Sequence, residues 1–160
     1  WHEIARSSNS QGRIVQEVYA SDASTDSTTT TFPADDTIPQ NTEGKEAETL
    51  AITPTNSSNI LLITAGGLFS HSATNTQRLI ALFQDSTADA LAVSNNDSGN
   101  TTTPMEINLH HRMTAGTTSE TTFKLRFGPS SGTMYRNTTA GGRMYGGVAK
   151  TFMHIMEIKV

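Results

Sequence analysis

Strict alternation of apolar and polar residues over positions 104–114 is the sequence feature that most constrains the fold. One face of this segment carries Met105, Ile107, Leu109, His111 and Met113, and the other carries Glu106, Asn108, His110 and Arg112. A period of two is the signature of a half-buried β-strand. Residues 122–127 repeat the pattern. The turn-like stretch 114–119 between them contains Gly116, so the two strands are predicted to form an antiparallel hairpin.

Composition extends this prediction to the whole chain. Thr occurs 26 times, Ser 16 times and Asn 10 times among 160 residues. Thr favours strands, whereas Ser and Asn favour turns. The apolar segment 77–84 predicts a strand that is covered on both faces. We therefore predict an all-β protein, an antiparallel jelly-roll-like β-sandwich of about 8–10 short strands, with residues 12–160 forming a single domain.

Charge and hydropathy exclude several classes of partner. The net charge is −4, and the 11 Lys and Arg residues are scattered along the chain, which predicts no nucleic-acid binding. The longest apolar run is Ile60 to Ile63, far shorter than the roughly 20 residues that span a bilayer, so no membrane insertion is expected. The absence of cysteine excludes disulfides, thiolate zinc sites and cysteine nucleophiles.

The motifs that could carry chemistry favour structural interpretations. Residues 128–132 match the G-x-S-x-G string, but they join two predicted strands, whereas a nucleophile elbow needs a strand, a turn and a helix. His110 and His111 are adjacent on a strand and cannot chelate one metal ion together. His111 and His154 could meet across the core, where a hydrogen-bonded histidine is favoured over a metal ligand; one His at a threefold axis is the alternative. We predict no enzymatic activity, no metal and no cofactor.

A Gly-rich loop at 141–147 is flanked by the residue types that binding sites favour. Tyr135, Arg136, Arg143 and Tyr145 are the candidate ligand-binding residues, because exposed Tyr and Arg on loops of a β scaffold form many contact surfaces. The alternative is structural: the tyrosines close one end of the sandwich, and the glycines let the chain cross over.

The final segment, 151–160, carries apolar side chains on both faces of its first half. One face consists of Phe152, His154, Met156, Ile158 and Val160. If that face packs in the core, Met153 and Ile155 on the other face need a second cover. We predict that Met153 and Ile155 form the subunit interface of a homotrimer; a loop that covers them is the alternative.

The order of several segments resembles a recurring domain of tailed-bacteriophage tail fibre and virion surface proteins. The resemblance is carried by residues 12–19, 50–54, 57–62, 78–87, 134–137 and 152–158. It implies a compact β-sandwich, commonly trimeric, that is located in the virion among other virion proteins. The function it implies is that of a tail fibre receptor-binding domain, which attaches to a bacterial surface glycan or protein.

Two other functions remain open beside host attachment. One is a capsid decoration or head-fibre protein with a purely structural role, and the other is a polysaccharide depolymerase. Residues 1–11 do not belong to the pattern, and they are interpreted as an N-terminal arm or as the end of a preceding fibre segment.

Overall fold

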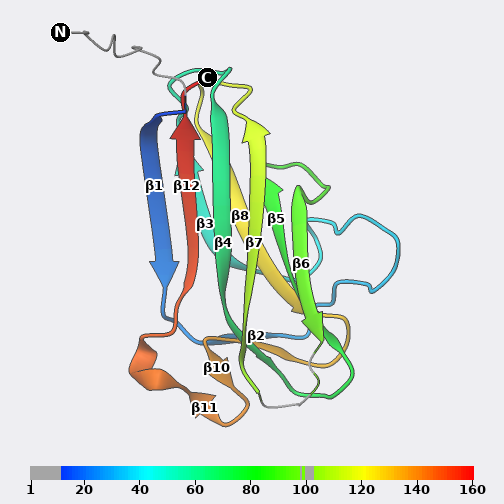
Figure 1. Cartoon of the computed structure of the whole chain (residues 1–160). Helices are drawn as coiled ribbons and strands as arrows, with labels where there is room; N and C mark the ends of the chain where they lie inside the picture. The colour runs from blue at the N-terminus through cyan, green and yellow to red at the C-terminus, as the bar shows by residue number, and fades with distance from the viewer. Residues whose placement is uncertain (1–11, 98, 100–102) are drawn as a thin grey trace, which may run out of the picture.

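The computed structural model describes residues 12–97, 99 and 103–160, and it shows two antiparallel β-sheets packed face to face (Figure 1). The predicted arm at residues 1–11 lies outside the described residues. The first sheet consists, in spatial order, of β1 (Ile14–Asp22), β12 (Thr151–Ile158), β4 (Ile60–His71) and β7 (Met105–Thr114). The second sheet consists of β3 (Lys45–Ile52), β8 (Thr121–Pro129), β5 (Gln77–Gln84) and β6 (Ala92–Asp97).

The connectivity of these eight strands is that of a jelly roll. Taken in chain order, the first, eighth, third and sixth long strands form one sheet, and the second, seventh, fourth and fifth form the other. Two interlocked Greek keys produce this order. The predicted all-β, antiparallel jelly-roll-like sandwich is therefore confirmed.

Short elements close the lower end of the sandwich in Figure 1. They are β2 (Asp26–Thr28), β9 (Met134–Arg136), β10 (Thr138–Thr139), β11 (Gly142–Arg143) and the single 3₁₀ turn η1 (Tyr145–Gly147). β9 pairs with the last three residues of β4 and with β2, while β10 and β11 pair with each other. The described residues contain no helix that is long and apolar enough to cross a bilayer.

The core lies between the two sheets and is built from alternate residues of every long strand except β1 and β6. Leu61, Ile63 and Ala65 of β4 face Phe123, Leu125 and Phe127 of β8, and all six are buried. A second, smaller cluster covers the outer face of β5, where Phe32 packs with Leu79, Ala81 and Phe83. The prediction that residues 77–84 form a strand covered on both faces is confirmed.

The predicted hairpin at 114–119 is wrong, because β7 and β8 belong to different sheets. β7 pairs with β4, and β8 pairs with β3 and β5. The connecting segment crosses between the sheets and is anchored to the turn before β4: Ala115 N–H donates to Asn59 O, and Gly116 N–H donates to Ser57 O, each over 2.8 Å. The segment is an arch whose short polar sequence resembles that of a hairpin turn.

The two faces of β12 contain the predicted sets of residues, but their assignment is reversed. Met153 and Ile155 are fully buried in the core of one chain and therefore cannot contact a neighbouring copy as they were predicted to do. The opposite set, which includes Phe152 and Met156, is half-buried on the outer face. The inward set also includes Glu157, whose carboxylate is fully buried and accepts several hydrogen bonds.

The backbone at the upper end of the sheet joins the first described residues to the last strand. Gly12 N–H donates to Lys159 O over 2.8 Å, and Lys159 N–H donates to Arg13 O over 2.9 Å. β1 and β12 then run antiparallel along their whole length, apart from one irregularity after Ile14.

Candidate functional site

The outward surface of the sheet β1-β12-β4-β7 carries an apolar strip, which we call the outer face. Register places its side chains in rows across the strands, because every second residue of a strand points outward. The strip contains five half-buried apolar residues, namely Ile60, Leu62, Phe152, Met156 and Ile158. It continues onto the edge strand β1, where Ile14 is 49% exposed and Tyr19 is 60% exposed. Among residues 12–97, 99 and 103–160, no segment buries these side chains completely.

The corresponding surface of the second sheet is different. β8 presents Thr122, Lys124 and Arg126 outward between its buried residues. The next strand, β5, is covered by Phe32, which comes from the segment after β2. Single exposed apolar residues are normal on soluble proteins, whereas a contiguous uncovered strip marks an interaction surface. The outer face of the first sheet is therefore the candidate functional site.

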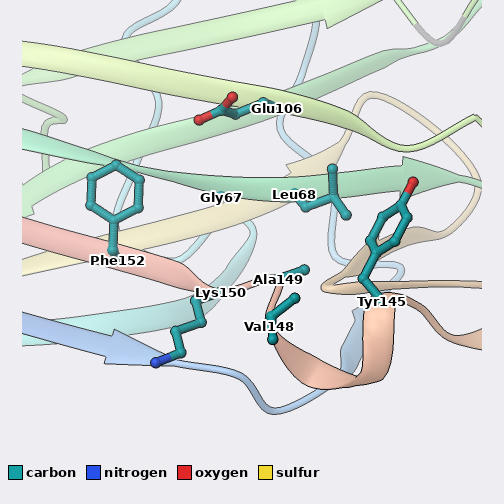
Figure 2. Close-up of a pocket in the computed structure, with 8 residues that line it drawn as sticks. All are labelled: Gly67, Leu68, Glu106, Tyr145, Val148, Ala149, Lys150 and Phe152. Carbon is teal, nitrogen blue, oxygen red and sulfur yellow. The ribbon is translucent and has the colours of Figure 1, made fainter.

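A groove deepens the lower end of the outer face, as Figure 2 shows. The groove has a volume of about 320 Å³ and lies between the strands and the segment around η1. Leu68 and Phe152 line its sheet side, and Tyr145, Val148 and Lys150 line the other side (Figure 2). Tyr145 and Val148 are 62% and 78% exposed, so apolar surface extends beyond the flat sheet.

Polar groups on the outer face differ between its two sides. On the β1 side, Glu17 Oε2 lies 3.4 Å from His154 Nε2, and the Tyr19 ring meets the His154 ring edge-on at a centroid distance of 6.1 Å. On the β7 side, His110 Nδ1 lies 3.1 Å from the Thr64 hydroxyl. The β1 side of the surface thus carries an acidic and an aromatic side chain, and the β7 side carries His110 and Arg112 together with Glu106. Apolar residues lie between the two sides.

The four candidate ligand-binding residues do not share one environment. Arg136 is 5% exposed: it forms an ion pair with Asp22 over 2.9 Å and donates to Ala47 O over 2.8 Å. Hydrogen bonds from Ser24, together with the charge of Arg136, lower the pKa of Asp22 below its ordinary value. Arg136 therefore holds β9 to the rest of the sandwich.

Tyr135 is half-buried on β9, whereas Arg143 and Tyr145 are exposed on and after β11. Among the four predicted residues, these two are the ones free to contact a partner. Ligand binding by them stays a prediction. Tyr145 also lines the groove at the lower end of the outer face, which connects this part of the prediction to the candidate site.

The histidines and the G-x-S-x-G string occupy structural positions. His111 faces the inside of the sandwich, where burial lowers its pKa, and His154 lies on the outer face, so the predicted meeting of the two does not occur. Ser130 follows β8, and its hydroxyl accepts a hydrogen bond from Gln77 N–H over 3.0 Å. Within the described ranges, no three His, Asp or Glu side chains are grouped so that they could hold a metal ion.

The residues that build the outer face were largely missed because alternation separates the two faces of a strand without showing which one is inward. Leu62 and Met156 lie opposite each other on neighbouring strands. The sequence pattern considers Met156 for the protein's own core and predicts no face for Leu62. The signal that could have found them is the second, equally apolar set on β12, because both sets need cover.

Three solved structures illustrate the proteins to which this chain is similar in fold. The structure of Eiger TNF from S. frugiperda has 10% sequence identity, a TM-score of 0.39, and coverage of 72% of this chain and 62% of that chain. The infectious bursal disease virus VP2 subviral particle has 11% identity, a TM-score of 0.43, and coverage of 91% and 34%. The structure of the infectious bursal disease virus Gt strain has 14% identity and a TM-score of 0.44. The match covers 92% of this chain and 38% of that chain. This chain spans less than two thirds of the length of each. No curated protein sequence matches it.

The family comparison overturns the predicted resemblance to tailed-bacteriophage domains. The family model that matches is the chlamydial Pgp3 C-terminal domain, and it covers residues 28–160, from the end of β2 through β12. The predictions of a tail fibre receptor-binding domain, a capsid decoration or head-fibre protein, a depolymerase and a virion location are therefore wrong. The predicted virion partners rested on the same resemblance and lose its support. The strings that suggested them are strand sequences whose layout other jelly rolls share. The chain belongs to the Pgp3 C-terminal domain family.

Proposed function

We propose that this domain is a non-catalytic assembly module that associates with copies of itself through the outer face. The uncovered apolar strip on β1, β12 and β4 is the observation that carries the proposal. Burying such a strip releases roughly 25 cal/mol for each Å² of apolar surface removed from water. The described titratable groups with shifted pKa values are explained by burial and by hydrogen bonds within the fold, which is consistent with a structural role.

The shape of the apolar surface favours a homotrimer over a dimer. Two flat faces stacked about a twofold axis would cover the centre of the strip but leave Ile14, Tyr145 and Val148 in water. A contact between unlike parts of two copies also uses the edge strand and the groove beside η1. Such heterologous contacts close into rings, and three copies form the smallest ring. The predicted binding of a bacterial surface glycan or protein loses its support with the phage resemblance.

Changing Met156 to lysine is expected to disrupt assembly. Met156 is half-buried at the centre of the outer face, next to Leu62. A lysine there would place an ammonium group in the apolar contact, which we expect to weaken association by about a hundredfold or more. Sedimentation velocity at micromolar concentration measures the change, with the unmodified chain sedimenting as a trimer and Met156→Lys as a monomer.

Val93→Lys is the matched control, because Val93 is 48% exposed on β6 of the second sheet. This variant is expected to sediment like the unmodified chain. Far-ultraviolet circular dichroism of both variants shows whether the fold is retained. An unmodified chain that sediments as a stable monomer contradicts the proposed function, and a stable dimer contradicts the trimer.

A further inference from the structure

We propose that Glu17 of one copy pairs with Arg112 of the next, so that the β1 side of one outer face contacts the β7 side of its neighbour. The inference rests on the proposed self-association and adds to it the surfaces that meet and their orientation. The partner is a second copy of this chain, and charge complementarity is the argument for it.

Glu17 is positioned as an outward acceptor at one side of the outer face. It lies on the edge strand β1, and its side chain is 66% exposed. His154, whose side chain is 31% exposed, approaches it to 3.4 Å from β12. Tyr19, the next outward residue of β1, is 60% exposed and flanks the same position. The carboxylate thus stands in a partly apolar setting with room for a second partner.

Arg112 is the corresponding donor on the other side. It is exposed on β7, which is also an edge strand along this stretch, and it has no ion pair among the residues that the structure describes. Arg112 and Leu62 together border two hollows of about 270 and 260 Å³. His110, the neighbouring outward residue, adds a second basic group and is held by Thr64. Glu106 is further down the same strand and is the acidic group on this side.

The register shows that Glu17 and Arg112 cannot satisfy each other within one chain. Glu17 is opposite Met156, Met156 is opposite Leu62, and Leu62 is opposite Arg112. The two charges therefore end one row that crosses four strands, and three strand spacings separate them by about 14 Å. In a heterologous contact, the end of the row in one copy meets the opposite end in the next.

The apolar residues beside the two charges would strengthen the attraction between Glu17 and Arg112. Leu62 and Met156 would exclude water around the pair, and a carboxylate matches the planar fork of an arginine. Close charge pairs across interfaces couple strongly enough to change affinity by tenfold or more. The pair would also set the register of the contact, because shifting by one outward row of β7 brings Glu17 to His110 or Thr114 and away from the guanidinium of Arg112.

Exchange of the two charges tests the pairing in the full chain. Glu17→Arg and Arg112→Glu are each expected to weaken association by about tenfold or more, and the double variant is expected to recover most of this loss. Sedimentation equilibrium measures the three dissociation constants beside that of the unmodified chain. Glu46→Arg and Lys124→Glu, on the outward side of the second sheet, are the matched controls and should leave association unchanged.

A cross-linking experiment gives the orientation without relying on the charged variants. Because the chain has no cysteine, copies carrying Glu17→Cys can be mixed with copies carrying Arg112→Cys and treated with a short bismaleimide. The mixture is expected to give linked pairs, whereas either variant alone gives few. Linkage in the separate samples that equals the linkage in the mixture overturns the proposed orientation.

The outcomes separate this inference from the proposed function. If the unmodified chain is a trimer and the double variant is as weak as the two single changes combined, the Glu17–Arg112 pairing is wrong while self-association stands. If the unmodified chain is a monomer, both are wrong. Should the charge exchange impair folding, Glu17→Gln and Arg112→Gln replace it, and an affinity equal to that of the unmodified chain overturns the pairing.

Discussion

Replacing Arg78 by methionine is expected to lower the free energy of unfolding by about 3–5 kcal/mol, the largest loss expected from one side chain in this domain. Arg78 is fully buried, with an exposure of 0%, at the start of β5. Its guanidinium donates to Asn96 Oδ1, Asp97 O and Thr103 O, each over 2.8 Å, and to Phe69 O over 3.4 Å. It thereby ties β6, the end of β4 and the start of the β7 region together.

The expected cost arises from the acceptors that the substitution would leave behind. Methionine fills a similar length but donates no hydrogen bond, so buried carbonyl oxygens would lose their partners. Burial lowers the pKa of Arg78, and the charge of Asp97 partly offsets this effect. Urea unfolding at one protein concentration measures the loss, and Arg13→Met, at an exposed position, is the control. A loss below about 1 kcal/mol would show that the network is dispensable.

Glu157→Gln is expected to cost about 2–4 kcal/mol at pH 7 and to change how stability depends on pH. The Glu157 carboxylate accepts from Thr55 N–H over 2.9 Å, from the Thr55 hydroxyl over 2.7 Å, from Asn56 N–H over 3.2 Å and from Asn59 Nδ2 over 2.6 Å. These bonds fasten the turn before β4 to the last strand. In glutamine, the side-chain NH2 group would face N–H and O–H donors that now donate to the carboxylate of Glu157.

The direction of the pH effect follows from the pKa of Glu157. Burial alone would raise this pKa, but the hydrogen bonds from Asn59, Thr55 and Asn56 together outweigh burial, so the pKa in the folded chain is lowered. The unfolded chain therefore binds the proton more readily. The stability that this carboxylate contributes is complete above the unfolded value, about 4.3, and is lost as the pH falls through the folded pKa.

Unfolding measured from pH 7 down to pH 3 tests this expectation. The unmodified chain should lose stability on acidification below about pH 4.3, and Glu157→Gln should lose less over the same interval because it has no such group to protonate. Glu120→Gln, at an exposed position, should keep the slope of the unmodified chain. Parallel curves for the unmodified chain and Glu157→Gln would contradict the assignment of acid sensitivity to this carboxylate.

The buried Glu157 shows why the sequence predicts the strands better than it predicts which side chains form the surface. Alternation over residues 105–113 identified β7, because one face of that strand is apolar and the other polar. On β12 both faces carry apolar residues, so alternation does not show that the face with Glu157 is the inward one. The burial of Glu157 depends on Thr55 and Asn59, about a hundred residues earlier. Pairing partners distant in sequence leave no local pattern.

Composition misled the prediction of the binding residues for a related reason. Tyr and Arg beside glycines resemble an exposed contact loop, yet Arg136 is committed to Asp22 and Ala47. The arch after β7 resembled a hairpin because turn residues show that the chain reverses, not which sheet it enters next. Likewise, the order of strand segments suggested a phage domain because strand layout reflects the jelly roll and carries little information about the family.

The backbone hydrogen bonds that join Gly12 and Arg13 to Lys159 have a mechanical consequence. Because β1 and β12 are antiparallel and their outer ends are adjacent, tension applied at Gly12 and Lys159 would act across the strands rather than along them. The hydrogen bonds between β1 and β12 would break one pair at a time. The two strands would therefore separate at a lower force than strands pulled along their axes. Contact of β1 with a neighbouring subunit would then stabilise the pairing of β1 with β12 against this separation.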